Sequence, residues 1–190
     1  AKMFEKLSRL DNLTGLYNDR FFFESLEKEI DRAVLKNMDV SLIFFDLDHF
    51  KDVNDTHGHL AGSRTLKEVG GLLEEIFNKT KAVVSRYGGD EFVIILPDTG
   101  LEVAGEYAET LRKKIEDNIF IKEAAGAKEK ALNIKGIITC SAGVASLKEN
   151  IISDRKTMRI GTALISQADK AMYEAKEQGK NKVCFAEGRI

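Results

Sequence analysis

In the segment AVVSRYGGDEFVIIL, residues 82–96, two apolar runs flank Gly88-Gly89 and Asp90-Glu91. The β-branched runs on either side predict two strands. Paired glycines between such runs indicate a two-residue hairpin turn of type I′, because both central residues need positive φ and glycine adopts it without steric cost. The turn explains the glycines, but adjacent carboxylates repel each other and form strands poorly. Asp90 and Glu91 therefore need a separate explanation.

A second pair of acids follows an earlier strand-like run. Residues 41–45 lead directly into Asp46-Leu47-Asp48. Such a run predicts a strand buried on both faces, and the i, i+2 spacing places both aspartates on one face. If this strand pairs with the hairpin, up to four carboxylates converge. Crowded carboxylates have raised pKa values, and a hard cation such as Mg²⁺ relieves the repulsion. The two segments together predict a metal site, with an ordinary polar turn as the alternative.

These segments and two further motifs resemble the GGDEF family of diguanylate cyclases. Residues 11–18, DNLTGLYN, are similar to the family signature D-x-L-T-G-L-x-N, and residues 46–62 are similar to D-x-D-x-F-K-x-x-N-D-x-x-G-H-x-x-G. Near the end of the chain, residues 168–181 resemble the A-D-x-A-L-Y-x-A-K-x-x-G-R-N block, with Lys180 where relatives carry arginine. The resemblance covers residues 11–185 and implies a nucleotidyl cyclase.

The expected order of elements agrees with an α+β fold. Hydrophobic periodicity predicts helices over Asn18–Lys36, Leu60–Phe77, Leu101–Ile121 and Ile160–Gln178, and strands over Val40–Asp46, Ala82–Ser85, Phe92–Leu96, Ile134–Ala145 and Lys182–Phe185. This order contains a ferredoxin-like β-α-β-β-α-β core with added helices, which places the first strand beside the hairpin. The resemblance implies a nucleotide-cyclase or polymerase-palm-like sheet. Residues 121–135 are expected to form a solvated helix extension and loop.

Length and composition fit one catalytic domain. The chain has 190 residues, of which 43% are hydrophobic and 32% are charged. We expect residues 1–10 to end a connecting helix and residues 11–190 to form the GGDEF domain. In relatives such a helix leads from a sensor or receiver domain, so an upstream domain is expected here. Apolar runs are far shorter than the roughly 20 residues that cross a bilayer, which favours a cytoplasmic domain without membrane contact.

Charge and cysteine usage exclude some partners. The net charge of −2 argues against nucleic-acid binding, although a single nucleotide could still occupy a local pocket. Cys140 and Cys184 lack metal-ligand spacing and are expected to be buried, reduced thiols.

The resemblance also implies the reaction and its residues. A 3′-hydroxyl attacks the α-phosphorus of a nucleoside triphosphate and pyrophosphate leaves. The implied catalytic groups are Asp46, Asp90 and Glu91, which with the Leu47 carbonyl bind two Mg²⁺ or Mn²⁺ ions per half-site; Glu91 either binds metal or assists deprotonation. The implied phosphate-binding residues are His49, Phe50, Lys51, Lys176 and Lys180. One half-site holds one triphosphate, so two domains must face each other as a homodimer.

Base recognition contains the main departure from the family pattern. Asn54 matches the asparagine that binds guanine, but Ser63 stands where relatives carry an aspartate. A carboxylate only accepts hydrogen bonds and selects guanine, whereas a hydroxyl can accept from guanine or donate to adenine. Serine at this position resembles the hybrid promiscuous subset that makes 3′,3′-cyclic GMP-AMP. Both GTP and ATP are therefore expected as substrates, with a strictly GTP-specific diguanylate cyclase as the alternative.

The product-binding motif of the family is also missing. Relatives that are inhibited by their product carry R-x-x-D shortly before the motif glycines, whereas Asn78–Val83 contains neither arginine nor aspartate. The motifs are compatible with three functions: an active cyclase, a degenerate nucleotide receptor and a nucleotide-free dimerisation module. A receptor would retain R-x-x-D and lose metal ligands, and this chain has the opposite pattern. The sequence favours activity.

Overall fold

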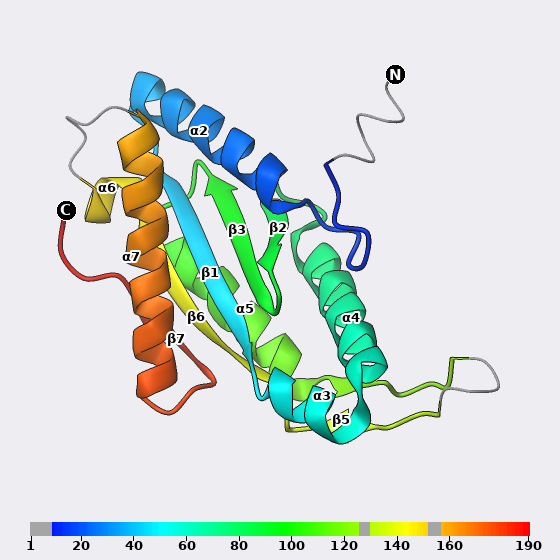
Figure 1. The fold of residues 1–190 in the computed structure, drawn as a ribbon. Coiled ribbons are helices and arrows are strands. Elements are labelled where there is room, and N and C mark those ends of the chain that lie inside the picture. The colour runs from blue at the N-terminus through cyan, green and yellow to red at the C-terminus, as the bar shows by residue number, and fades with distance from the viewer. Residues whose placement is uncertain (1–8, 126–129, 152–156) are drawn as a thin grey trace, which may run out of the picture.

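A five-stranded sheet forms the centre of the computed structural model, which describes residues 9–125, 130–151 and 157–190 (Figure 1). Its strand order is β2-β3-β1-β6-β7. The strands are β1 Val40–Asp48, β2 Val83–Gly88, β3 Glu91–Pro97, β6 Thr139–Ser146 and β7 Lys182–Phe185. Neighbouring strands are antiparallel except β6 and β7, which are parallel. The first four strands have the ferredoxin-like order and β7 extends the sheet by one edge strand, so the expected fold class is confirmed.

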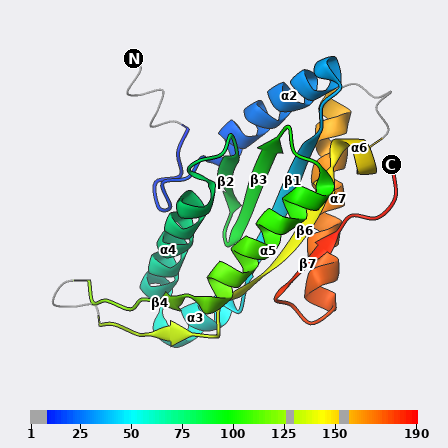
Figure 2. The same ribbon diagram turned by 180° about the vertical axis from the view of Figure 1, so that it is seen from behind.

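Helices cover both faces of this sheet (Figures 1 and 2). One face is covered by α2 and α7, and the other by α4 and α5. The helices are α2 Asp19–Lys36, α3 Phe50–His57, α4 His59–Phe77, α5 Leu101–Asp117, α6 Leu147–Asn150 and α7 Thr157–Glu177. Each sheet face is apolar because side chains alternate along the buried strands. In β1, Leu42 and Phe44 pack under α2 and α7, whereas Ile43, Phe45 and Leu47 pack under α4 and α5.

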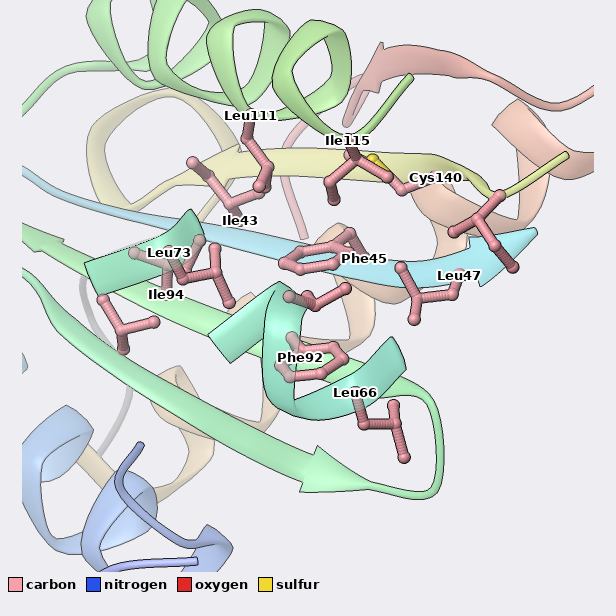
Figure 3. Close-up of a cluster of buried hydrophobic side chains, with 14 of the residues drawn as sticks. Ile43, Phe45, Leu47, Leu66, Leu73, Phe92, Ile94, Leu111, Ile115 and Cys140 are labelled. Carbon is pink, nitrogen blue, oxygen red and sulfur yellow. The ribbon is translucent and has the colours of Figure 1, made fainter. Parts of the chain in front are cut away.

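The core beneath α4 and α5 fixes the register of the central strands. Figure 3 shows Phe45 of β1 and Phe92 of β3 among the side chains of this core. The two rings stack with centroids 5.1 Å apart, and both residues are fully buried. They are paired across the strands, so the next pair is Asp46 with Glu91. A slip of one residue would move these rings to the opposite face of the sheet, so the packing of this core holds the acids opposite each other.

Two predicted elements have different boundaries in the structure. The helix predicted over residues 101–121 ends at Asp117, because Asn118 is extended, and Ile119–Phe120 forms β4. The strand predicted over residues 134–145 is broken at Gly136, where φ is 69°, into β5, Ile134–Lys135, and β6. Strands β4 and β5 pair as a second sheet, so the described parts of this region, residues 119–125 and 130–135, form a β-arm and not the predicted helix extension. Burial of Phe120 and Ile134 explains why strands form here in place of the helix extension.

The arm is fastened to the first half of α4. Glu68 accepts the Ile121 N–H at 3.0 Å, and the Arg64 guanidinium donates to the Glu123 and Lys130 carbonyls. Periodicity could not reveal these contacts, because they join segments more than 50 residues apart in the chain.

Three smaller expectations can be compared with the structure. Most of the expected connecting helix, residues 1–8, lies outside the described residues, and Leu10 pairs with Tyr17 in an isolated β-bridge. Both cysteines are free as expected, but only Cys140 is buried, whereas Cys184 is half-buried. Of the helices that the structure describes, none combines the length and apolarity that a membrane span requires.

Candidate active site

The acidic cluster is built where β1 meets the β2–β3 hairpin. Asp46 on β1 faces Glu91 on β3, and the Leu47 N–H donates to the Asp90 carbonyl at 3.2 Å. The strand pairing therefore brings together the three predicted catalytic acids, Asp46, Asp90 and Glu91, and the Leu47 backbone. These residues come from two segments that are about 45 positions apart in the sequence.

The hairpin turn differs from the prediction. Gly88 is the last residue of β2 and pairs with Glu91, so the central residues are Gly89 and Asp90. Of the two glycines only Gly89 has positive φ, 49°, and the predicted type I′ turn centred on Gly88-Gly89 is wrong. A register shift between Arg86 and Gly88 explains the difference, because a bulge places one extra residue on β2. The shift turns Asp90 into a loop residue beside β1.

The environment of the cluster raises the pKa values of Asp46 and Glu91. Burial and the charges of Asp90 and Glu91 raise the pKa of Asp46 to about 6, although the Lys176 ammonium, 2.8 Å away, opposes the shift. Burial, followed by the charges of Asp169 and Asp90, raises the pKa of Glu91. The ionised cluster is thus under-compensated, which is the state that a divalent cation relieves.

By themselves, the carboxylates of the cluster supply only part of the oxygen ligands that a hard cation needs. Among the described residues, no three His, Cys, Asp or Glu side chains are arranged as a closed metal site. Asp46 instead pairs with Lys176, as an ion pair that is largely shielded from solvent. Mg²⁺ prefers oxygen ligands and is commonly held by one or two carboxylates together with substrate phosphates. Asp46 and Asp90 suit such an open site, which the substrate itself would complete.

Asp48 does not join the acidic cluster, contrary to the expectation of four convergent carboxylates. Its carboxylate accepts hydrogen bonds from the Thr139 and Ser141 hydroxyls at 2.7 and 2.8 Å and from the Asn181 N–H at 3.0 Å. The residue is 2% exposed. Three donors satisfy the buried charge, so Asp48 is tied to β6 and to the turn after α7, whereas Asp46 two residues earlier lies in the acidic cluster and pairs with Lys176.

The predicted phosphate-binding turn is the start of a helix. His49 has a φ of 61° and precedes α3, which begins at Phe50 and includes the exposed Lys51. Among the described residues, no side chain caps this helix end, because the His49 ring contacts Asp52 instead. Backbone N–H groups at a helix N-terminus attract anions through their partial positive charge. A helix N-terminus therefore suits the predicted phosphate-binding role better than a simple turn would.

The two lysines near the end of the chain do not share a helix face. Lys176 lies in the last turn of α7, and its ammonium contacts Asp46 at 2.8 Å. Lys180 lies beyond the helix end at Glu177, with a φ of 64° and an exposed side chain. The two side chains therefore do not project from one helix face, because α7 ends before Lys180. Lys176 lies in the acidic cluster, whereas the direction of the Lys180 side chain depends on the conformation of the turn after α7.

The predicted base-binding residues lie on two successive helices. A Cβ atom at Gly62 would meet the Asn54 Oδ1 at 1.9 Å, so the Asn54 amide lies directly against the backbone of α4. Ser63 is the next residue on that helix and is half-buried. Glycine at position 62 therefore permits the close approach of the Asn54 amide to the α4 backbone, one residue before Ser63.

Sequence reasoning missed the residue that braces the hairpin turn. The Arg86 Nε and Nη2 atoms donate to the Gly89 carbonyl at 3.0 and 2.7 Å, and its Nη1 atom reaches Asp11 at 3.3 Å. Asp11 opens the first family-like motif, and it also accepts the Thr14 N–H at 2.9 Å. This clamp joins two motifs that are 75 residues apart and holds the loop that carries Asp90. The position of Arg86 close to the glycines was the only signal in the sequence for this role. Its partner Asp11 can be identified only from the fold.

Comparison with known proteins agrees with this geometry. The family model described as "Diguanylate cyclase, GGDEF domain" matches residues 8–182. The chain is 36% identical to the diguanylate cyclase DgcP of Pseudomonas aeruginosa over 91% of its length, but spans only 23% of that protein. It is 34% identical to the diguanylate cyclase VdcA of Vibrio cholerae over 94% of its length and spans 47% of that relative. The chain thus corresponds to less than half of these relatives.

Solved structures match over nearly the whole chain. The coiled coil and GGDEF domain of DgcB from Caulobacter crescentus, in complex with c-di-GMP, aligns with a TM-score of 0.81 at 27% identity and covers 97% of this chain and 89% of that one. The diguanylate cyclase SiaD of Pseudomonas aeruginosa, in complex with its activator SiaC, aligns with a TM-score of 0.78 at 31% identity. The alignment covers 97% of this chain and 64% of the SiaD chain. The motifs, the sheet and these matches agree, and the chain belongs to the diguanylate cyclase family as a GGDEF domain.

Proposed function

We propose that this domain condenses two nucleoside triphosphates into a 3′,3′-cyclic dinucleotide and releases pyrophosphate. The observation that carries the proposal is the placement of Asp46, Asp90 and Glu91 at the strand end from which α3 begins. Carboxylates suited to a divalent cation beside N–H groups suited to phosphate are what phosphoryl transfer requires. Membership of the diguanylate cyclase family supports the same reaction.

In the proposed reaction the 3′-hydroxyl oxygen of one nucleotide bonds to the α-phosphorus of the other. The bond between that phosphorus and the bridging oxygen of the β-phosphate breaks, and pyrophosphate leaves. Cyclases of this family use divalent metal ions, and we assign Asp46, Asp90, Glu91 and the Leu47 carbonyl to hold two Mg²⁺ or Mn²⁺ ions per half-site. Such ions neutralise phosphate charge and activate the attacking hydroxyl when bound.

The phosphates are assigned to groups on two elements. The N–H groups at the start of α3 and the Lys51 ammonium bind the β- and γ-phosphates, and Lys176 and Lys180 add positive charge from the end of α7. Lys176 contacts Asp46 in the structure, and it would turn to phosphate once a cation neutralises that carboxylate. The raised pKa of Glu91 supports a role in accepting the hydroxyl proton as well as in binding metal.

We also propose relaxed base choice, because Ser63 replaces an acceptor-only carboxylate with a hydroxyl that can rotate. The proposal is supported by the Asn54 amide, which lies against Gly62, the residue before Ser63 on α4. The domain would then accept ATP as well as GTP and form cyclic GMP-AMP beside cyclic di-GMP.

The experiment that tests the proposed function is product analysis by mass spectrometry with Mg²⁺ and GTP alone, ATP alone or an equimolar mixture. Cyclic di-GMP from GTP and cyclic GMP-AMP from the mixture are expected. If GTP yields only cyclic di-GMP and ATP is ignored, the domain is a strict diguanylate cyclase. If no mixture yields a cyclic dinucleotide while GTP binds, the domain is a receptor.

Catalysis should require two copies of the domain. A cyclic dinucleotide contains two phosphodiester bonds, so two half-sites must face each other with two-fold symmetry. Turnover per enzyme is therefore expected to rise with protein concentration and with a dimerising fusion placed before Ala1. Initial rates measured across the monomer–dimer transition, located by analytical ultracentrifugation, check this. A constant rate per enzyme down to monomeric concentrations contradicts a dimeric active form.

We propose that a regulatory domain upstream of this one controls such pairing.

Product inhibition should be weak. The region that corresponds to the missing R-x-x-D motif borders a hollow of about 600 Å³ lined by Glu74, Glu75, Asn78 and Ala82, among others. Carboxylates at this position repel a phosphodiester, and Lys79 offers only a point charge in place of a guanidinium fork. Isothermal titration with cyclic di-GMP is expected to detect no tight binding. Tight, stoichiometric binding that disappears in Lys79→Ala would overturn this expectation, with Lys113→Ala on α5 as the control.

A further inference from the structure

The turn after α7 has an unusual backbone. Three successive residues have positive φ: Gly179 at 107°, Lys180 at 64° and Asn181 at 48°. Lysine and asparagine adopt this region at a cost, which persists only where surrounding contacts hold the conformation in place. The contacts that hold this turn therefore indicate what its shape is for.

The Lys180 N–H donates to the Ala175 carbonyl at the end of α7, and Asn181 supplies the contacts that tie the turn to the rest of the fold. Its N–H donates to the Asp48 carboxylate at 3.0 Å. Its side-chain Oδ1 atom accepts from the Arg112 guanidinium at 2.8 Å, and its Nδ2 atom donates to the Glu116 carboxylate at 2.7 Å. The same residue is thus tied to the end of β1 and to the C-terminal half of α5.

Both anchors are themselves fixed. Asp48 is 2% exposed and also accepts the Thr139 and Ser141 hydroxyls. The Arg112 side chain is 13% exposed and forms ion pairs with Glu109 at 2.6 Å and Glu116 at 2.8 Å. Paired networks of this kind restrict the motion of their members. Asn181 is therefore held by two side chains that are themselves paired, one of which lies two residues from Asp46.

We propose that Asn181 is a positioning residue that fixes the backbone of Lys180, so that the Lys180 ammonium reaches the triphosphate. The inference rests on the proposed function. Lys180 needs this support because a lysine presents a point charge on a flexible stem and lacks the planar fork with which arginine selects its own geometry. The tether also joins the turn to β1, whose end carries Asp46, so the phosphate-binding turn and the acidic cluster share one anchor.

The test is a double-mutant cycle between Asn181→Gly and Lys180→Met. Glycine keeps the left-handed backbone accessible and removes only the side chain, and methionine keeps most of the lysine stem without its charge. Each single variant is expected to lower kcat/KM for GTP about tenfold and to weaken binding of a non-hydrolysable GTP analogue about tenfold, as befits one charge-assisted contact. The double variant should lose no more than about threefold beyond either single variant.

Asn37→Gly is the matched control. Asn37 has a φ of 52° at the C-terminal end of α2, and it lies outside the proposed site. This variant should keep kcat/KM and analogue affinity within about twofold of the wild type, and thermal melts should show all variants folded at the assay temperature. Losses that multiply to about a hundredfold in the double variant, or an Asn181→Gly variant that behaves like the control, would overturn the proposal. If the wild type binds the analogue but forms no dinucleotide, the proposed function fails, and the affinities still decide the role of Asn181.

Discussion

Asp46→Asn is expected to lower cyclic dinucleotide formation by about 10³-fold or more, while it stabilises the metal-free protein at pH 8. The loss follows because a metal site that contributes several kcal/mol of transition-state stabilisation would lack a charged ligand. The gain follows from burial of the carboxylate beside Asp90 and Glu91, which raises its pKa to about 6. Activity and stability should therefore change in opposite directions, which distinguishes a functional charge from a structural one.

The pH dependence has a definite sign. The folded-state pKa of Asp46 lies above the usual value of about 3.9, so the folded protein binds this proton more tightly than the unfolded chain does. The contribution of Asp46 to the free energy of unfolding is fully present below about pH 4 and is lost as the pH rises through about 6. Asp46→Asn removes that loss, and its free energy of unfolding should exceed that of the wild type by about 1–3 kcal/mol at pH 8.

Urea denaturation at pH 4 and pH 8 with a chelator measures this effect, and the difference between the two proteins should vanish at pH 4. Asp117→Asn, an exposed aspartate at the end of α5, is the control and should leave both stability and turnover unchanged. Undiminished turnover in Asp46→Asn would eliminate the assigned metal site. A lower stability of that variant at pH 8 would contradict the crowding of the acids.

Ser63→Asp is expected to shift the product mixture toward cyclic di-GMP by about one to two decades. The carboxylate would accept from the guanine edge and repel the N1 lone pair of adenine, and one charge-assisted hydrogen bond contributes about 1.5–3 kcal/mol. Ser63 is half-buried on α4, so the contact is only partly screened by solvent.

The measurement is the ratio of cyclic GMP-AMP to cyclic di-GMP formed from equimolar GTP and ATP. Ser166→Asp, at an exposed serine of α7, introduces the same charge elsewhere and should leave the ratio unchanged. An unchanged ratio in Ser63→Asp would place base selection in other residues.

Strand-level features of the site could be predicted from the sequence. The apolar run before Asp46 and the alternation around Phe92 both reflect burial on the sheet, and burial is what hydrophobic periodicity reports. Once the order of elements indicated the ferredoxin-like topology, the meeting of Asp46 with Glu91 followed. The elements that were missed are those in which tertiary contacts outweigh local preference, as in β4 and β5, where burial of Phe120 ends the helical pattern.

Roles that depend on partners across the fold could not be predicted. Asp46 and Asp48 have the same local sequence environment, yet Asp48 is satisfied by hydroxyls of β6 and Asp46 is not. Likewise, the Arg86 clamp on Gly89 requires Asp11, and the turn at Asn181 requires Arg112. Each of these pairs is separated by 69 residues or more, and one sequence contains no signal that links them.

We expect the Asp46 cluster to direct the condensation of two triphosphates into a ring. The most direct test is simultaneous measurement of pyrophosphate and cyclic dinucleotide from GTP with Mg²⁺, in the wild type and in Asp46→Asn. Two pyrophosphates should be released for each cyclic di-GMP by the wild type, and neither product should form in the variant or with a chelator. A linear product with one pyrophosphate, or an equal yield of cyclic dinucleotide from Asp46→Asn, would contradict this expectation.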